Sequence, residues 1–319
     1  MKLEKAVKTD EKLLNHDFIR LMDYQKQDLF YLLELAGQMK HNWQAGIHSK
    51  PLEGRVLGML FMKPSTRTRV SFETGMSQLG GTGIYLEADQ LQLGRGETMA
   101  DTATALSGYL DGMLIRTFSQ DMIDTFAAHA TIPVINGLTD MYHPCQVLAD
   151  LQTIREMKGA LKGVRLTYLG DSNNVAHSLM IGAAMTGMDI TIGTPDHCRP
   201  DEGVIQKASV IAGNSGSKMA ITSEPVSAIR GADVVYTDVW TSMGQEYEQT
   251  DRQQMLEAYQ VNAALLSEAK HDAIFMHCLP AHRGEEVTAD VIDGKQSVVF
   301  QQAENRLHAQ KALMMALMG

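Results

Sequence analysis

Residues 65–69 (STRTR) bring hydroxyl and guanidinium groups together at the start of an expected helix. They follow the apolar residues 56–62, which predict a strand, and they lead into residues 67–79, whose spacing predicts a helix. The first N–H groups of a helix lack intrahelical acceptors and favour an anion. Arginine adds paired hydrogen bonds to phosphate oxygens. The motif therefore predicts a phosphate site, and an ordinary N-cap beside solvated arginines is the alternative interpretation.

Three further features of the first half could support such a site. Arg116 ends the apolar residues 112–116, and ligands bind α/β sheets at the carboxyl ends of parallel strands. Residues 143–146 (HPCQ) open a helix, in which Pro144 suits the first position and His143 could donate a hydrogen bond to a carbonyl oxygen. Residues 90–97 (QLQLGRGE) read as a polar loop. The alternative for Arg116 is a structural ion pair. For residues 143–146 it is a capped helix start, and for residues 90–97 it is a plain surface loop.

Two motifs in the second half follow expected strands. Residues 238–244 (DVWTSMG) place a carboxylate and a glycine-containing loop after a strand, which suits capture of a cationic amine, although a simple turn would look similar. Residues 277–284 (HCLPAHRG) put a cysteine beside two histidines. A nucleophile or a metal site is conceivable there, but the sequence has neither a local Ser/Cys–His–Asp signature nor zinc-ligand spacing. A buried cysteine at a strand end is the simpler interpretation.

Alternating apolar and amphipathic segments must position these motifs. Expected strands occupy residues 56–62, 83–87, 112–116, 133–136, 164–169, 189–194, 218–222, 234–238 and 273–277. Expected helices occupy residues 17–40 (as one or two helices), 67–79, 99–110, 121–130, 145–158, 175–187, 204–212 and 304–318. This alternation predicts an α/β fold with two βαβ domains, each a parallel sheet flanked by helices. Residues 170–174 (GDSNN) also lie between a strand and a helix, but they lack the glycines of a dinucleotide-binding loop.

Length and composition narrow the class of protein. A chain of 319 residues fits two domains, and we place them at 1–148 and 149–319, with a hinge near 137–150. The net charge of -10 and the pI of about 5.5 disfavour a nucleic-acid binder. The charged N-terminus has no secretory pattern, and no apolar stretch is long enough to span a membrane. Three cysteines do not make a disulfide framework, so we expect a cytoplasmic protein.

The order of the motifs resembles that of the ornithine carbamoyltransferases. The matching segments are residues 61–69 (FMKPSTRTR), 143–146, 238–244, 277–280 (HCLP) and 300–306 (FQQAENR), so the resemblance covers nearly the whole chain. The STRTR and HPxQ motifs are shared with aspartate carbamoyltransferases, whereas the SMG loop and HCLP resemble the ornithine branch. The resemblance implies that the C-terminal helix, about 304–319, returns to the first domain. The first domain would bind carbamoyl phosphate and the second would bind ornithine.

The resemblance also implies roles for individual residues. Carbamoyl phosphate would be bound by Ser65, Thr66, Arg67, Thr68, Gln92, Arg116, His143, Gln146, Cys278, Leu279 and Arg306. Ornithine would be bound by Asn174, Asp238, Ser242 and Met243. Arg116, His143 and Cys278 would be the catalytic residues, and Gln92 would reach in from a neighbouring subunit of a homotrimer or a multiple of trimers. No cofactor, metal, nucleic acid or membrane is implied.

The implied reaction belongs to arginine metabolism. The side-chain amine of L-ornithine attacks carbamoyl phosphate, and citrulline and phosphate form without a covalent enzyme intermediate. One alternative is a carbamoyltransferase for another amine such as putrescine, against which the SMG loop argues. The other is an inactive binding or regulatory subunit, which would be expected to lack a phosphate-binding group. Ser65, Arg67, Arg116 and His143 are all present.

Overall fold

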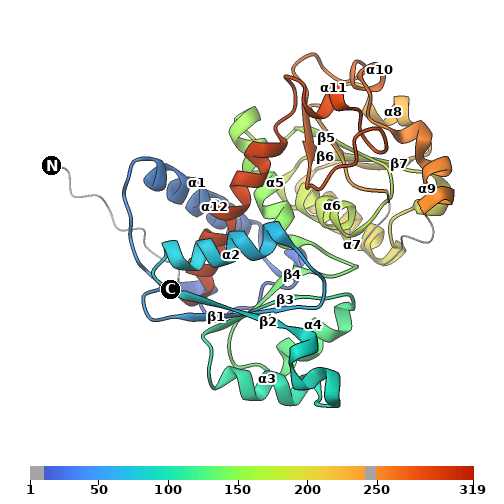
Figure 1. Ribbon diagram of the computed structural model, residues 1–319. Coiled ribbons are helices and arrows are strands. Elements are labelled where there is room, and N and C mark those ends of the chain that lie inside the picture. Colours follow the sequence, from blue (N-terminus) through green and yellow to red (C-terminus); the bar gives the residue numbers. More distant parts are fainter. Residues whose placement is uncertain (1–10, 241–248) are drawn as a thin grey trace. The chain divides into compact units, whose positions relative to one another are not determined.

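The computed structural model describes residues 11–240 and 249–319 (Figure 1). The chain divides into two compact units. Unit 1 comprises Met1–Gln152 and Asn305–Gly319, and unit 2 comprises Thr153–Glu304. The two boundaries fall within helices α5 (Pro144–Lys158) and α12 (Val299–Met318), so neither boundary is a linker.

Unit 1 contains a four-stranded parallel sheet with the order β2-β1-β3-β4. The strands are β1 (Val56–Phe61), β2 (Thr82–Glu87), β3 (Gly112–Arg116) and β4 (Val134–Leu138). The two central strands are almost wholly buried, as expected for continuous apolar runs in a parallel sheet. Phe61 pairs with Arg116, and Arg116 pairs with Leu138. The carboxyl ends of three strands are therefore aligned at one edge.

The helices of unit 1 alternate with its strands, as predicted. They are α1 (Lys26–Gln44), α2 (Thr66–Gln78), α3 (Met99–Ser107), α4 (Gln120–His129) and the start of α5. Two short 3-10 segments, η3 (Ala88–Gln90) and η4 (Gln92–Arg95), lie in the predicted loop between β2 and α3.

The C-terminal helix α12 packs on unit 1, which confirms the prediction for residues 305–319. Lys40 of α1 donates a hydrogen bond to Asn305, and the backbone N–H of Asn15 donates to the carbonyl of Leu317. A Cβ at Gly75 of α2 would meet the terminal methyl of Met314 at 2.7 Å, so α12 packs closely against α2. The helix begins at Val299, earlier than the predicted residue 304.

Unit 2 contains a five-stranded parallel sheet with the order β7-β6-β5-β8-β9. The strands are β5 (Arg165–Leu169), β6 (Asp189–Gly193), β7 (Met219–Thr222), β8 (Val234–Thr237) and β9 (Ile274–His277). The helices are α6 (Asn174–Thr186), α7 (Glu202–Ser215), α8 (Pro225–Ile229), α9 (Gln249–Leu256), α10 (Ala263–Leu266) and α11 (Ala289–Ile292). The prediction missed α8 to α11, because α8, α10 and α11 are too short to repeat an apolar period and the sequence of α9 is mostly polar.

The described residues include no helix that is long and apolar enough to cross a membrane.

Candidate active site

The loop after β1 delivers the STRTR segment to the start of α2. Ser65 caps the helix, and its hydroxyl accepts a hydrogen bond from the N–H of Thr68 at 3.2 Å. The N-cap interpretation is therefore correct for Ser65, but it leaves the exposed first turn at Thr66 available to an anion. Arg67 is half-buried, and its Nε has no hydrogen-bond partner among the described residues.

The two arginines of the motif have different environments. Arg69 donates to Glu73 at 3.0 Å, and its guanidinium lies 3.8 Å from the ring centroid of Tyr85. These contacts bind the Arg69 side chain to α2 and β2. Arg67 is therefore the arginine of the pair that suits an external anion.

Arg116, His143 and Arg306 form a buried cluster of two guanidinium groups and one imidazole in unit 1. Arg116 is the last residue of β3, His143 immediately precedes α5, and Arg306 lies on α12. Burial lowers the pKa of His143 well below its ordinary value of 6.5, and the charges of Arg306 and Arg116 lower it further. The imidazole is therefore neutral at pH 7, so it can donate one hydrogen bond without bringing a third positive charge.

Gln146 and Thr68 also belong to the candidate site of unit 1. Gln146 is fully buried, and its Nε2 donates to Asp150 at 2.8 Å, while its Oε1 has no hydrogen-bond partner among the described residues. An unused amide oxygen suits an incoming N–H donor. Thr68 accepts a hydrogen bond from Arg306 at 2.7 Å, which brings the C-terminal helix to the STRTR segment.

Gln92 is not brought to this cluster by any contact within the described residues. It starts η4, its side chain is exposed, and its carbonyl accepts from the N–H of Glu97. Its proposed role in a neighbouring subunit stays a prediction.

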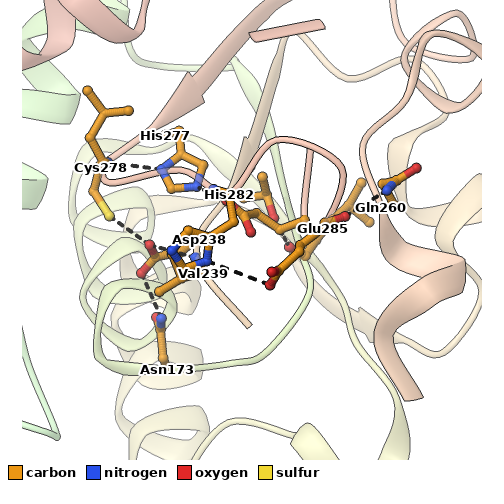
Figure 2. A network of polar contacts seen from close by, with 12 residues as sticks. Asn173, Asp238, Val239, Gln260, His277, Cys278, His282 and Glu285 are labelled. Atoms are coloured by element: carbon orange, nitrogen blue, oxygen red, sulfur yellow. Dashed lines mark hydrogen bonds and ion pairs between the residues drawn. The ribbon is translucent and has the colours of Figure 1, made fainter. Parts of the chain in front are cut away.

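Asp238 is the centre of the polar network in unit 2 (Figure 2). It is buried at the end of β8, where Oδ2 accepts from Asn173 Nδ2 at 2.7 Å. Its Oδ1 accepts from the Val239 N–H at 2.8 Å and from the Cys278 thiol at 2.9 Å. The thiol donates its proton to a carboxylate in this geometry, which is unlike an activated thiolate nucleophile.

His277 is held by hydrogen bonds at both ring nitrogens. Its Nδ1 accepts from the N–H of Leu279 at 2.9 Å, so Nε2 carries the proton and faces Glu286 at 3.2 Å. Neither nitrogen is then left to act as a base for Cys278. Leu279 has a positive φ of 59° and precedes a cis peptide bond to Pro280. The hydrogen bond to His277 helps to hold this uncommon backbone conformation.

The structure brings together possible metal ligands that sequence spacing did not reveal. Ligand atoms of Asp238, His277 and Cys278 lie within 4.8 Å of one another. The prediction set a metal aside because no third ligand had the usual spacing, but Asp238 reaches Cys278 from another strand. The ring nitrogens of His277 are both engaged with protein groups, so this arrangement would have to change before His277 could bind an ion.

The ornithine residues inferred from the resemblance are only partly described. Asn174 begins α6 and is half-buried, whereas Ser242 and Met243 lie outside the described residues. Sequence reasoning missed Asn173, which caps α6 through Oδ1 and donates to Asp238 through its amide. Asparagine directly before an apolar helix is an N-cap signal that could have identified it.

Two domain models of one protein family match successive parts of the chain. Residues 16–156 match the family model described as aspartate/ornithine carbamoyltransferase, carbamoyl-P binding domain. Residues 162–317 match the Asp/Orn binding domain of the same family.

Curated relatives and solved structures match along nearly the whole chain. An ornithine carbamoyltransferase of Oceanobacillus iheyensis is 62% identical over 309 residues, which cover 97% of this chain and 96% of the relative. The corresponding protein of Bacillus subtilis is 54% identical over 310 residues, covering 97% of this chain and 96% of that protein. The solved structure of ornithine carbamoyltransferase from Pyrococcus furiosus has a TM-score of 0.94 and 51% identity, and the match covers 98% and 99% of the two chains. The chain therefore belongs to the aspartate/ornithine carbamoyltransferase family.

Proposed function

We propose that this protein transfers the carbamoyl group of carbamoyl phosphate to the side-chain amine of L-ornithine, giving L-citrulline and phosphate. The observation that carries the proposal is the chemical contrast between the units. Unit 1 gathers Arg116, Arg306 and a neutral His143, whereas unit 2 presents the buried Asp238. The first set suits a phosphorylated anion and the second suits an amine.

Unit 1 is the proposed carbamoyl phosphate domain. Arg67 and the first turn of α2 are assigned to the phosphate group, together with Ser65, Thr66 and Thr68. Arg116 and His143 are assigned to the carbonyl oxygen, where negative charge develops when the carbon becomes tetrahedral. The unused Oε1 of Gln146 is an acceptor for the amino group of the substrate. Removing one donor to the developing oxyanion, such as Arg116 or His143, typically costs on the order of 10²–10³ in rate.

Unit 2 is the proposed ornithine domain, with Asn174, Asp238, Ser242 and Met243 as the binding residues. An alkyl amine has a pKa near 10 in water, so it arrives as a cation and must lose a proton before attack. Asp238 attracts and orients the cation. The first proton of the cation goes to solvent. The amine nitrogen then bonds to the carbonyl carbon, the carbon–oxygen bond to phosphate breaks, and phosphate leaves with the electron pair and takes up the second amine proton. Cys278 and Leu279 hold the groups at this position without forming a covalent bond to the substrate.

The proposed assembly is a homotrimer in the cytoplasm. The structure describes all three cysteines and none forms a disulfide, which fits a reducing compartment. Light scattering of the purified protein measures the assembly directly.

The experiment that tests the function supplies carbamoyl phosphate with either L-ornithine or putrescine. Citrulline and phosphate are then measured. We expect equal amounts of the two products with ornithine and little turnover with putrescine. Arg67→Ala and Arg116→Ala should each lower the rate by about 10²–10³. Turnover with putrescine alone would overturn the ornithine assignment. Wild-type rates in both arginine variants would overturn the assignment of the phosphate site.

A further inference from the structure

Lys63, Phe118 and Asp140 occupy equivalent places beyond three neighbouring strands of unit 1. Each lies two residues past the end of its strand, after Phe61 of β1, Arg116 of β3 and Leu138 of β4. Those three strand ends are aligned, because Phe61 pairs with Arg116 and, after a register shift between β3 and β4, Arg116 pairs with Leu138; β3 lies between the other two strands. The sheet hydrogen bonding extends past the strands, since the N–H of Asp140 donates to the carbonyl of Phe118 at 2.8 Å.

Lys63 connects the two outer loops across the middle one. Its Nζ lies 2.5 Å from Asp140 Oδ1 and 4.0 Å from the ring centroid of Phe118. The Lys63 side chain is only 6% exposed, whereas that of Asp140 is 63% exposed. The ammonium is therefore buried between an aromatic face and a carboxylate that remains in water. A buried cation needs such partners, because desolvation otherwise disfavours its charge.

Three of the proposed carbamoyl phosphate residues lie next to these three loops. Ser65 lies two residues after Lys63, Arg116 lies two residues before Phe118, and His143 lies three residues after Asp140. Fixing the three loops against one another thus fixes the positions of a helix cap, a guanidinium and an imidazole. Displacements of about 1 Å in such groups can cost on the order of 10²-fold in rate.

We propose that Lys63, Phe118 and Asp140 form a strand-end clasp, and that Lys63 is a positioning residue for carbamoyl phosphate rather than a ligand of it. This inference rests on the proposed function for the identity of the substrate. The clasp acts by holding the loops in place, since the Lys63 ammonium already contacts the Asp140 carboxylate and the Phe118 ring.

The test is a double-mutant cycle of Lys63→Met and Asp140→Asn, with Lys63→Arg as the conservative variant. Steady-state citrulline formation gives kcat and KM for each substrate, and calorimetry gives the Kd of carbamoyl phosphate. We expect each single variant to lower kcat/KM for carbamoyl phosphate by roughly tenfold or more, with KM for ornithine nearly unchanged. The double variant should be no worse than the poorer single variant, because both break one contact. Lys63→Arg should recover part of the loss.

The control is Arg55→Met, which removes the Arg55–Asp111 ion pair at the opposite end of β1 and β3 in the same sheet. We expect it to stay within about twofold of wild type. A large loss in Lys63→Met with normal kinetics in Asp140→Asn would show that Lys63 binds phosphate directly, which would overturn the clasp. Lower melting temperatures with unchanged kcat/KM would also overturn it. If wild type makes no citrulline, the proposed function fails, and the Kd cycle with carbamoyl phosphate still decides the clasp.

Discussion

Arg306 Nη2 donates a hydrogen bond to Thr68 Oγ1 at 2.7 Å, although 238 positions separate the two residues. Both side chains are buried in unit 1. Thr68 also donates its N–H to the cap at Ser65, so one residue links the C-terminal helix to the proposed phosphate loop. The positive charge of Arg306 contributes to the lowered pKa of His143 as well. The last helix of the chain thus takes part in the site at the first strand.

Substitution Arg306→Met should therefore lower kcat/KM for carbamoyl phosphate by about 10²–10³, because a buried donor that we propose faces the substrate is lost. Thr68→Val should cost less, since the guanidinium remains. Steady-state kinetics at saturating ornithine measures both. The control is Lys40→Met, which removes the hydrogen bond from α1 to Asn305 on the same helix. A rate for Arg306→Met within threefold of wild type would contradict this role.

The neutral His143 predicts how stability depends on pH. Burial lowers its folded-state pKa well below the ordinary value of 6.5, so at pH values between the two the unfolded chain binds more protons than the folded chain. Stability therefore rises with pH in this window and falls as the solution is acidified below about 6.5.

Urea unfolding between pH 7.5 and 5.5 measures this contribution. We expect wild type to lose stability relative to His143→Gln by on the order of 1 kcal/mol over that range. The comparison with the variant removes the contributions of other titrating groups. His48→Gln changes an exposed histidine and serves as the control for losing a histidine. Identical slopes for wild type and His143→Gln would show that His143 is not held neutral by the fold.

Lys311 predicts a second dependence on pH, at the alkaline side. Its side chain is buried on α12, it donates to Gln78 at 2.8 Å, and burial lowers its pKa to about 8. Between pH 8 and the ordinary value of 10.5 the unfolded chain holds the extra proton, so stability increases with pH there.

Wild type should accordingly gain stability over Lys311→Met as pH rises from 8 to 10, by up to about 2 kcal/mol. Chemical denaturation of both proteins at several pH values measures the difference. Lys207→Met alters an exposed lysine of α7 and serves as the matched control. A constant difference between wild type and Lys311→Met across this range would mean that Lys311 keeps an ordinary pKa.

The sequence predicted the α/β architecture well because parallel strands buried on both faces are continuous apolar runs. The predicted strand at 112–116 coincides with β3, and other strand ends differ by a residue or two. Strand order could not be predicted, since the alternation of strands and helices does not say which strands are neighbours. Contacts between distant residues, such as Cys278 with Asp238, depend on that order.

The motifs of the candidate site were predicted from the sequence, but the contacts among their side chains were not. Nothing in the local sequence distinguishes Arg67 from Arg69, although Arg69 is bound to Glu73 and stacked on Tyr85. The role of Lys63 was equally hidden, because its partners come from loops after two other strands. Equal offsets from three strand ends become visible only when the register is known.

The contact between Cys278 and Asp238 separates a positioning role from covalent catalysis. Because the thiol donates to a carboxylate, Cys278→Ser should keep that hydrogen bond and retain at least about a tenth of wild-type kcat. Asp238→Asn removes the charge that we propose attracts the amine, so it should raise KM for ornithine and lower kcat while the Kd of carbamoyl phosphate stays near wild type. Steady-state kinetics and calorimetry measure these effects, and rapid quench followed by intact-protein mass spectrometry looks for a carbamoylated enzyme. An inactive Cys278→Ser together with a carbamoyl adduct on wild type would establish a covalent route. Activity in Cys278→Ser without an adduct would leave Asp238 as the group that orients the amine and the thiol as its hydrogen-bond donor.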